Sequence, residues 1–373
     1  MKRMDEPQAR LRRNVRRGAA LLLAAVAIVL TLAAGCGPKP GGGATGGRAQ
    51  GGGAIGGRTL RVGVVLDKGG PDDESFNAAA IEGVERAKRE LGVEERYLES
   101  QDASDYKTNL TTFAGQGYDV VFAVGYAMED AVKEVAPQFP DVKFAIVDGN
   151  APAGQPNTAA LLFREEQGCF LAGFLAASVS KTKTIGFVGG QDIPLIQKFE
   201  AGYRAGAKAA DPAVRVVSAY TNNWEDVSKG KNDAQQEFGN GADVIFHAAG
   251  KCGLGVIQAA QERGPGYYAI GVDRDQDYKA PGRVLTSMIK KTDVAVFDTC
   301  KRVKEGRFQP GPQMYDLKSG GVGLSEMKFT RKQIPQVVLD RLARAQKLVE
   351  SGSIAVPTTV DGVAKFRPGR IDP

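Results

Sequence analysis

The chain has 373 residues, with 49 lysines and arginines, 43 aspartates and glutamates, one histidine and a formal net charge of +6. Single hydrophobic cores stop growing at ~250–300 residues, so this length predicts two domains. The one histidine, His247, lies inside the apolar segment 242–250, where we expect a packed core residue. A metal cluster or catalytic triad based on histidine is therefore excluded.

The positive charge is concentrated at the N-terminus. Residues 1–57 hold nine basic and two acidic residues, which leaves 40 basic and 41 acidic side chains from Arg58 onward. A basic excess indicates nucleic acid as a partner only when the folded part carries it. The folded part has a formal net charge of −1, so no nucleic-acid partner is expected.

The first 35 residues have the pattern of a secretory signal. A basic segment, 1–17, precedes the apolar run Ala19–Ala34, whose 16 residues fall short of the ~20 that span a bilayer. A membrane-spanning anchor is the alternative. The end of the run, LAAGC, is similar to a bacterial lipobox, although Ala33 stands where that pattern usually has leucine. The resemblance implies cleavage before Cys36 and a lipid on Cys36. Paired arginines in 12–17 leave twin-arginine export open.

Residues 36–57 are rich in glycine and almost free of core-forming side chains. Such composition is typical of a flexible tether, here between a lipid anchor and a folded domain. Three further cysteines, Cys169, Cys252 and Cys300, lack metal-type spacing. They allow at most one disulfide, and the sequence does not select the pair.

From residue 58 the sequence alternates between short apolar strands and helices. Two series of similar order are predicted, one over 59–149 and the other over 184–273. Short apolar strands separated by helices of 10–16 residues predict parallel sheets covered on both faces. We therefore expect an α/β protein of two doubly wound lobes with right-handed crossovers. A returning strand and helix over 283–305, a glycine-rich segment over 311–325 and a helix over 334–350 complete the chain.

The carboxyl ends of parallel strands form the ligand crevice in such sheets. Two lobes that face each other across these edges would enclose a cleft. The positions that this rule selects are Asp67 with the loop after it, 125–126, 148–149, 189–190, Gly250 and Asp273.

Six segments resemble the basic membrane protein (Bmp/PnrA-like) family of bacterial lipoproteins. They are GGPDDESFN (69–77), EEQGCFLAGFLAA (165–177), IGFVGG with FEAGYRAG (185–206), DVIFHAAGKCGLGV (243–256), IGVDRDQ (270–276) and TSMIKK (286–291). The resemblance implies a type I periplasmic-binding-protein fold with three crossovers. We expect lobe one to comprise 58–161 and 290–310, and lobe two 162–289 and 311–373.

The resemblance also implies a function: substrate-binding proteins of ABC transporters that bind nucleosides, especially purine nucleosides. We therefore expect a monomeric, non-enzymatic receptor without cofactor or metal, which delivers its ligand to a membrane permease. It would be held to the outer face of the cell membrane through lipidated Cys36.

A nucleoside offers a flat base, a polar base edge and ribose hydroxyls. The family motifs indicate Phe76 and Phe199 as aromatic clamps, one from each lobe, although both also fit a core pattern. Asn77 and Asp148 suit the base edge. Trp224, the only tryptophan, either walls the pocket or covers the hinge.

Asp273 is expected to accept from the ribose hydroxyls, with Lys290 bonding ribose oxygens and balancing the buried charge of Asp273. Lys291 is the rival for the lysine role. Gly250 would let the backbone approach the ligand. Asp67 and Asp73 complete the candidate set, and Asp73 is also suited to capping the next helix.

Three alternatives remain open. A sensor of the same fold would report ligand occupancy to a signalling partner, and another small ligand, such as a sugar, would stack on the same aromatics. An enzyme such as a nucleoside hydrolase would use the carboxylates to activate water. The segment GKCGLG (250–255) lacks the residue order of a phosphate-binding loop.

Overall fold

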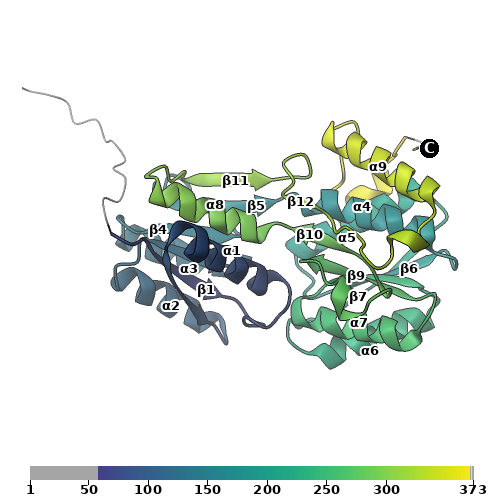
Figure 1. Ribbon diagram of the computed structural model, residues 1–373, viewed down its shortest axis with the longest axis horizontal. Helices are drawn as coiled ribbons and strands as arrows, with labels where there is room; N and C mark the ends of the chain where they lie inside the picture. The colour runs from purple at the N-terminus through teal and green to yellow at the C-terminus, as the bar shows by residue number, and fades with distance from the viewer. Residues whose placement is uncertain (1–57, 370, 372–373) are drawn as a thin grey trace, which may run out of the picture. The chain divides into compact units, whose positions relative to one another are not determined.

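The structure is a computed structural model that describes residues 58–369 and 371. The expected signal segment 1–35, the lipidation site Cys36 and the tether 36–57 lie outside these residues. Strands and helices alternate through most of the described chain, as the sequence predicts (Figure 1). The strands are β1 (Arg61–Leu66), β2 (Glu94–Glu99), β3 (Val120–Val124), β4 (Lys143–Val147), β5 (Thr158–Phe163), β6 (Thr184–Gly189), β7 (Arg215–Tyr220), β8 (Val244–Ala248), β9 (Tyr268–Asp273), β10 (Val284–Lys290), β11 (Gly311–Tyr315) and β12 (Val322–Leu324).

Helices connect these strands and cover the faces of the sheets. They are α1 (Phe76–Leu91), α2 (Ala103–Gly115), α3 (Glu129–Val135), α4 (Glu165–Val179), α5 (Pro194–Ala210), α6 (Val227–Gly239), α7 (Gly253–Arg263), α8 (Thr292–Lys304), α9 (Gln336–Glu350) and α10 (Val360–Lys365). Within the described residues, none of the helices is both long enough and apolar enough to cross a bilayer.

The strands form two sheets of six, one in each lobe. Lobe one has the order β11-β5-β4-β3-β1-β2, and all its neighbouring strands are parallel. Lobe two has the order β12-β10-β9-β8-β6-β7, in which only β12 runs antiparallel to its neighbour. The expected fold, two parallel-sheet lobes of the type I periplasmic-binding-protein kind, is confirmed.

The expected lobe boundaries differ from the observed strands at three points, one of which is Lys290, assigned to lobe one although it ends β10 in lobe two. β11 pairs with β5 in lobe one, whereas we had assigned 311 onward to lobe two. β5 also runs to Phe163, past the expected boundary at 161. The sequence did not indicate β11 because its residues, GPQMY, have little apolar character. The strand lies at the edge of the sheet, where each of its residues is partly or fully exposed.

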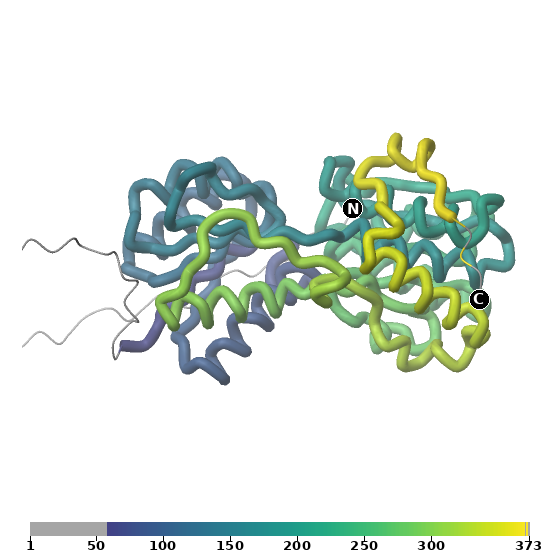
Figure 2. The backbone as a smooth tube through the Cα atoms, turned by 90° about the horizontal axis from the view of Figure 1, so that it is seen from above, coloured from purple at the N-terminus to yellow at the C-terminus, as the bar shows by residue number. Residues whose placement is uncertain are grey.

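Three crossovers join the lobes, at Arg164, at Lys291 and over 316–321. Backbone hydrogen bonds hold them side by side: the Arg164 amide donates to Tyr315 O and the Lys291 amide to Gly321 O, both at 2.9 Å. Figure 2 shows the chain passing between the lobes in this region. The crossovers therefore form one compact hinge. β10 ends at Lys290, directly before the crossover at Lys291, and this places Lys290 at the cleft.

Lobe two depends on close packing between α4 and α5. A Cβ added at Gly206 would lie 1.9 Å from the Phe170 carbonyl oxygen, and one at Gly173 would lie 1.9 Å from the Tyr203 carbonyl oxygen. Because these neighbours are backbone atoms, rotation of a side chain cannot relieve the contact. Glycine at both positions lets the two helix backbones approach each other.

We expect Gly206→Ala to lower the free energy of unfolding by about 1–3 kcal/mol, because overpacked cores cost this much. Gly115→Ala is the matched control: Gly115 ends α2 and nothing lies within 4 Å of its added Cβ. The control should be neutral or slightly stabilising. Urea titration followed by circular dichroism measures both, and equal effects of the two substitutions would contradict the packing argument.

The described cysteines, Cys169, Cys252 and Cys300, are all buried and free. His247 is fully buried, as expected for a packed core residue, and burial lowers its pKa to about 4. Its Nε2 lies 3.1 Å from Gln276 Oε1. The imidazole is therefore neutral at physiological pH and belongs to the interior of lobe two.

Candidate ligand-binding site

The strand register brings the predicted positions to one edge of each sheet. In lobe one Leu66 pairs with Val124, and Val124 pairs with Val147. The residues that follow β1, β3 and β4 therefore emerge together, as the crevice rule predicts. In lobe two Gly189 pairs with Ala248, and Asp273 pairs with Ile289.

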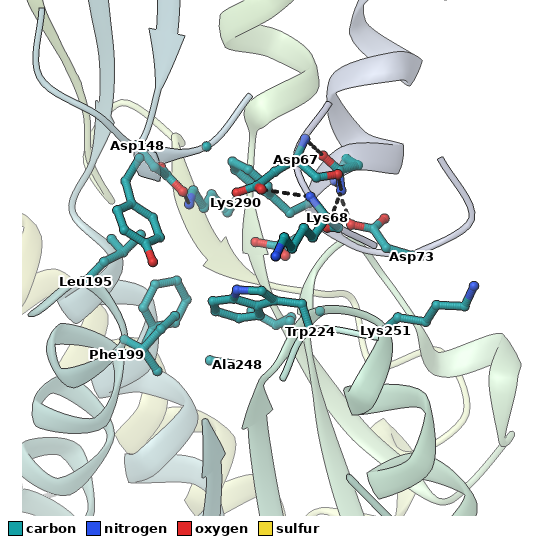
Figure 3. Close-up of a pocket in the computed structure, with 18 residues that line it drawn as sticks. Asp67, Lys68, Asp73, Asp148, Leu195, Phe199, Trp224, Ala248, Lys251 and Lys290 are labelled. Atoms are coloured by element: carbon teal, nitrogen blue, oxygen red, sulfur yellow. Dashed lines mark hydrogen bonds and ion pairs between the residues drawn. The ribbon is translucent and has the colours of Figure 1, made fainter. Parts of the chain in front are cut away.

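One pocket lies between the lobes at these edges and holds about 660 Å³ of space not filled by protein, including its opening. All ten predicted site residues line it: Asp67, Asp73, Phe76, Asn77, Asp148, Phe199, Trp224, Gly250, Asp273 and Lys290. Figure 3 shows Leu195, Phe199 and Trp224 on one side, and Asp67, Asp148 and Lys290 on the other. A mostly apolar and aromatic wall with a few charged groups is typical of sites for small organic ligands.

Asp148 and Asp273 occupy equivalent places in the two lobes. Asp148 follows β4 with a φ of 63°, and Asp273 ends β9 with a φ of 64°. Left-handed backbone is costly for residues other than glycine and clusters at functional sites. Each aspartate thus departs from the extended backbone conformation at the end of its strand, and both line the pocket.

Lys290 is the buried cation of the site, with a side chain only 2% exposed. Its Nζ donates to Asp148 Oδ2 and lies 3.3 Å from Glu165 Oε1. Burial alone lowers the pKa of Lys290, but the charges of Asp148, Glu165 and Asp273 raise it above its usual value. Lys290 is therefore charged. Its hydrogen-bond partner is Asp148, and its charge also balances that of Asp273, as we expected.

Asp148 keeps one oxygen for other partners. Burial raises the pKa of Asp148 to about 6, although the neighbouring Lys290 charge lowers it. Asp148 Oδ1 is buried and has no hydrogen-bond partner among the described residues. Because an unsatisfied buried acceptor is costly, this atom is suited to accept a hydrogen bond from a ligand.

Asp273 is held by lobe one. The Ser75 hydroxyl donates to Asp273 Oδ2, a contact between the lobes. Burial raises the pKa of Asp273, and the charge of Lys290 acts against that shift. Ser75 directly precedes α1, but its side chain makes no capping bond to that helix.

Asp73 and Asn77 hold the loop that follows β1. The Asp73 carboxylate accepts from the amides of Ser75, Asn77 and Ala78 at 2.8–3.0 Å, so it caps α1. The Asn77 amide group accepts from the Asp67 amide at 3.3 Å and donates to the carbonyl of Lys68 at 3.2 Å. In this structure both side chains position the loop, although we had expected Asn77 to face the base edge.

Asp67 is fixed by its own lobe as well. Its Oδ1 accepts from the Tyr106 hydroxyl and from the Lys68 amide, the latter at 2.7 Å. Burial raises the pKa of Asp67, and the bond from Tyr106 opposes that shift. Gly125, with a φ of 129°, leaves room for this carboxylate, since an added Cβ would lie 2.6 Å from Asp67 Oδ2.

The aromatic residues approach the pocket from both lobes. Lys290 Nζ lies 4.9 Å from the centroid of the Phe76 ring and 5.7 Å from that of Phe199. Trp224 lies against Gly190, where an added Cβ would be 2.0 Å from the indole Cζ3. Trp224 therefore walls the pocket rather than covering the hinge. Gly250, with a φ of 53°, is also in a backbone conformation that favours glycine.

Sequence reasoning missed several residues of the site. Leu195, Ile196, Ala248 and Val272 add to the apolar wall, and Lys251 lies at a polar part of the pocket. Lys251 had been considered only within a phosphate-loop motif. Its place directly after Gly250, at a strand end, was the available signal. Glu165 gave no signal, because its role depends on the crossovers that bring it to Lys290.

The fold and the pocket define a substrate-binding protein with two lobes. Residues 60–355 match the model of the family described as "ABC transporter substrate-binding protein PnrA-like". The chain belongs to this Bmp/PnrA-like family and is thus an ABC transporter substrate-binding protein.

Individual relatives agree with this assignment. The chain is 33% identical over 359 residues to the "ABC transporter nucleoside-binding protein BmpA" of Lactococcus lactis, covering 91% of this chain and 97% of that protein. It is 35% identical over 313 residues to basic membrane protein A of Borreliella burgdorferi, covering 82% and 90%. A solved solute-binding protein from Aeropyrum pernix superposes with a TM-score of 0.77 at 28% identity, covering 82% and 96%.

Proposed function

We propose that the protein captures a nucleoside, preferably a purine nucleoside, between its lobes and passes it unchanged to an ABC transporter permease. The observation that carries the proposal is the composition of the pocket, in which Phe76 and Phe199 from opposite lobes accompany buried carboxylates from both sheets. Aromatic side chains stack on bases of any sequence, at ~1–3 kcal/mol per base. The nucleoside-binding relative from Lactococcus lactis supports the same ligand class.

The two buried aspartates of the pocket each match a hydrogen-bond donor of a nucleoside. Asp148 Oδ1, buried and unpartnered within the described chain, is suited to accept from a base N–H. Asp273 uses Oδ2 for Ser75, so its other oxygen is suited to accept from ribose hydroxyls. A ligand with donors at both ends and a flat apolar body therefore satisfies both lobes at once. Ligand contacts with both lobes favour the closed state.

The proposal includes the location of the protein. Cys36 would carry the lipid after removal of 1–35, and 36–57 would tether the folded part to the outer face of the cell membrane. We further propose a monomer that performs no catalysis, and the buried, neutral His247 agrees with the absence of a histidine base from the site. The partner would be the permease of the same transporter.

Isothermal titration calorimetry with adenosine, guanosine, inosine and uridine tests the proposal. We expect saturable heats at micromolar or lower concentrations, with purine nucleosides binding more tightly than uridine. Glucose and free ribose are the matched ligands for the sugar alternative. Heat from a sugar but from no nucleoside below millimolar concentration would overturn the proposal. Release of free base during incubation would indicate the hydrolase alternative instead.

A further inference from the structure

Glu74 joins the two lobes at the edge of the pocket. Its carboxylate accepts from the Tyr278 hydroxyl at 2.6 Å and from Lys279 Nζ at 2.8 Å. Its backbone carbonyl accepts from Gln276 Nε2 at 3.0 Å. Arg274 lies 3.8 Å from the same carboxylate. One residue of lobe one is therefore bonded to a short segment of lobe two that begins directly after β9.

The partner in lobe two is anchored in the interior. Gln276 is fully buried, and its Oε1 accepts from the Val272 amide at 3.0 Å and contacts His247 Nε2 at 3.1 Å. Its own amide donates to Ser287 Oγ at 3.0 Å. These bonds tie Gln276 to β8, β9 and β10. Through its bond to Gln276, Glu74 is therefore connected to three strands of the sheet of lobe two.

The backbone of Glu74 is also unusual. Its φ of 55° lies in the left-handed region, which glycine adopts far more readily than glutamate. Such strain persists where surrounding contacts hold the residue. Here the contacts that hold it are those across the lobes, which involve both its side chain and its carbonyl.

Glu74 lies within the segment that carries ligand-site residues. Phe76 and Asn77, which line the pocket, follow it by two and three positions, and Ser75 donates to Asp273. Movement that breaks the Glu74 contacts therefore also displaces groups of the pocket. Closing of the lobes and enclosure of a ligand are therefore coupled through four consecutive residues, 74–77.

We propose that Glu74 is the positioning residue for lobe closure, and that its bonds to Gln276, Tyr278 and Lys279 set the residence time of the ligand. Glu74 is not among the residues that line the pocket. Exposed ion pairs contribute little one at a time, and the side chains of Glu74 and Lys279 are 35% and 28% exposed. The effect arises because several bonds to one residue break together when the lobes separate. The kinetic part of this proposal depends on the proposed nucleoside function, whereas the closure part does not.

Stopped-flow measurement with inosine tests the kinetic part, with Trp224 as the fluorescent reporter because it is the only tryptophan and lines the pocket. Glu74→Ala should raise koff about tenfold or more and change kon by less than about threefold, since bonds formed on closure mainly affect dissociation. Glu90→Ala is the matched control, because Glu90 pairs with Arg86 inside α1 and makes no contact across the lobes. An unchanged koff in Glu74→Ala would overturn the proposal.

Two further measurements separate closure from a local defect. Glu74→Ala and Lys279→Met should be non-additive in koff, since each removes the same bond. Small-angle X-ray scattering of ligand-free protein should give a larger radius of gyration for Glu74→Ala than for Glu90→Ala. Additive effects together with equal radii would contradict the proposal. If inosine gives no signal with the unaltered protein, the nucleoside function fails, while scattering still tests closure. Glu74→Gln is the fallback should the alanine variant fail to fold.

Discussion

Replacing Lys290 with methionine is expected to lower the free energy of unfolding by about 3–5 kcal/mol at pH 8. The substitution removes the only positive charge bonded to Asp148 in the described chain, whereas Glu165 keeps its ion pair with Lys198, so the buried Asp148 carboxylate is left without a cation. Uncompensated buried charges cost about this much. Urea denaturation followed by circular dichroism measures the change. Lys291→Met is the matched control, because Lys291 is adjacent and exposed, and it should alter stability by less than about 0.5 kcal/mol.

The loss caused by Lys290→Met should shrink as the pH falls. The pKa of Asp148 is already raised to about 6 by burial, and removal of the cation raises it further. A carboxyl whose folded-state pKa is raised contributes stability that is present at low pH and lost as the pH rises through that pKa. The deficit of the variant should therefore be larger at pH 8 than at pH 5. A deficit that stays constant over this range would contradict the assignment of the loss to buried charge.

Replacing Phe76 with alanine is expected to raise the Kd for a purine nucleoside about 5- to 150-fold. This range corresponds to the loss of ~1–3 kcal/mol of stacking on one base. Phe76 is the better choice for the experiment because it is only partly buried, whereas Phe199 is 3% exposed and also packs in the core. Calorimetry on the variant measures the change, and its thermal melt checks that the fold is retained.

Phe76→Leu distinguishes stacking from apolar burial. Leucine keeps most of the apolar bulk but has no aromatic face. The affinity of the Phe76→Leu variant for a purine nucleoside should therefore lie near that of Phe76→Ala. The Phe76 ring also lies 4.9 Å from Lys290 Nζ, and leucine loses that cation–π contact as well. If Phe76→Leu binds the nucleoside as tightly as the unaltered protein does, the prediction that Phe76 stacks on the base is wrong. Phe76→Tyr, which keeps the face, should then be compared with both.

The sequence predicted the edge of each sheet well because strand ends follow from local patterns. Apolar runs ending at Asp67, Asp148 and Asp273 indicated both the strands and the positions that line the pocket. The rule works without knowledge of packing, since parallel strands expose their carboxyl ends on one side. Family motifs supplied Phe76 and Phe199, which periodicity alone would have placed in the core.

The partners of these residues were beyond the reach of sequence reasoning. Ser75 meets Asp273 across 198 positions of the chain, and Lys290 meets Asp148 across 142. Such pairs depend on the crossovers and on how the lobes contact each other. Edge strand β11 was missed for a related reason, because its residues carry no apolar pattern and it forms only by pairing with β5.

A crystal structure of the protein grown with inosine tests the central claim most directly. The account predicts the base between Phe76 and Phe199, a base N–H bonded to Asp148 Oδ1, and ribose hydroxyls within hydrogen-bond distance of Asp273. A pocket without nucleoside at saturating concentration, or inosine bound away from these residues, would contradict it.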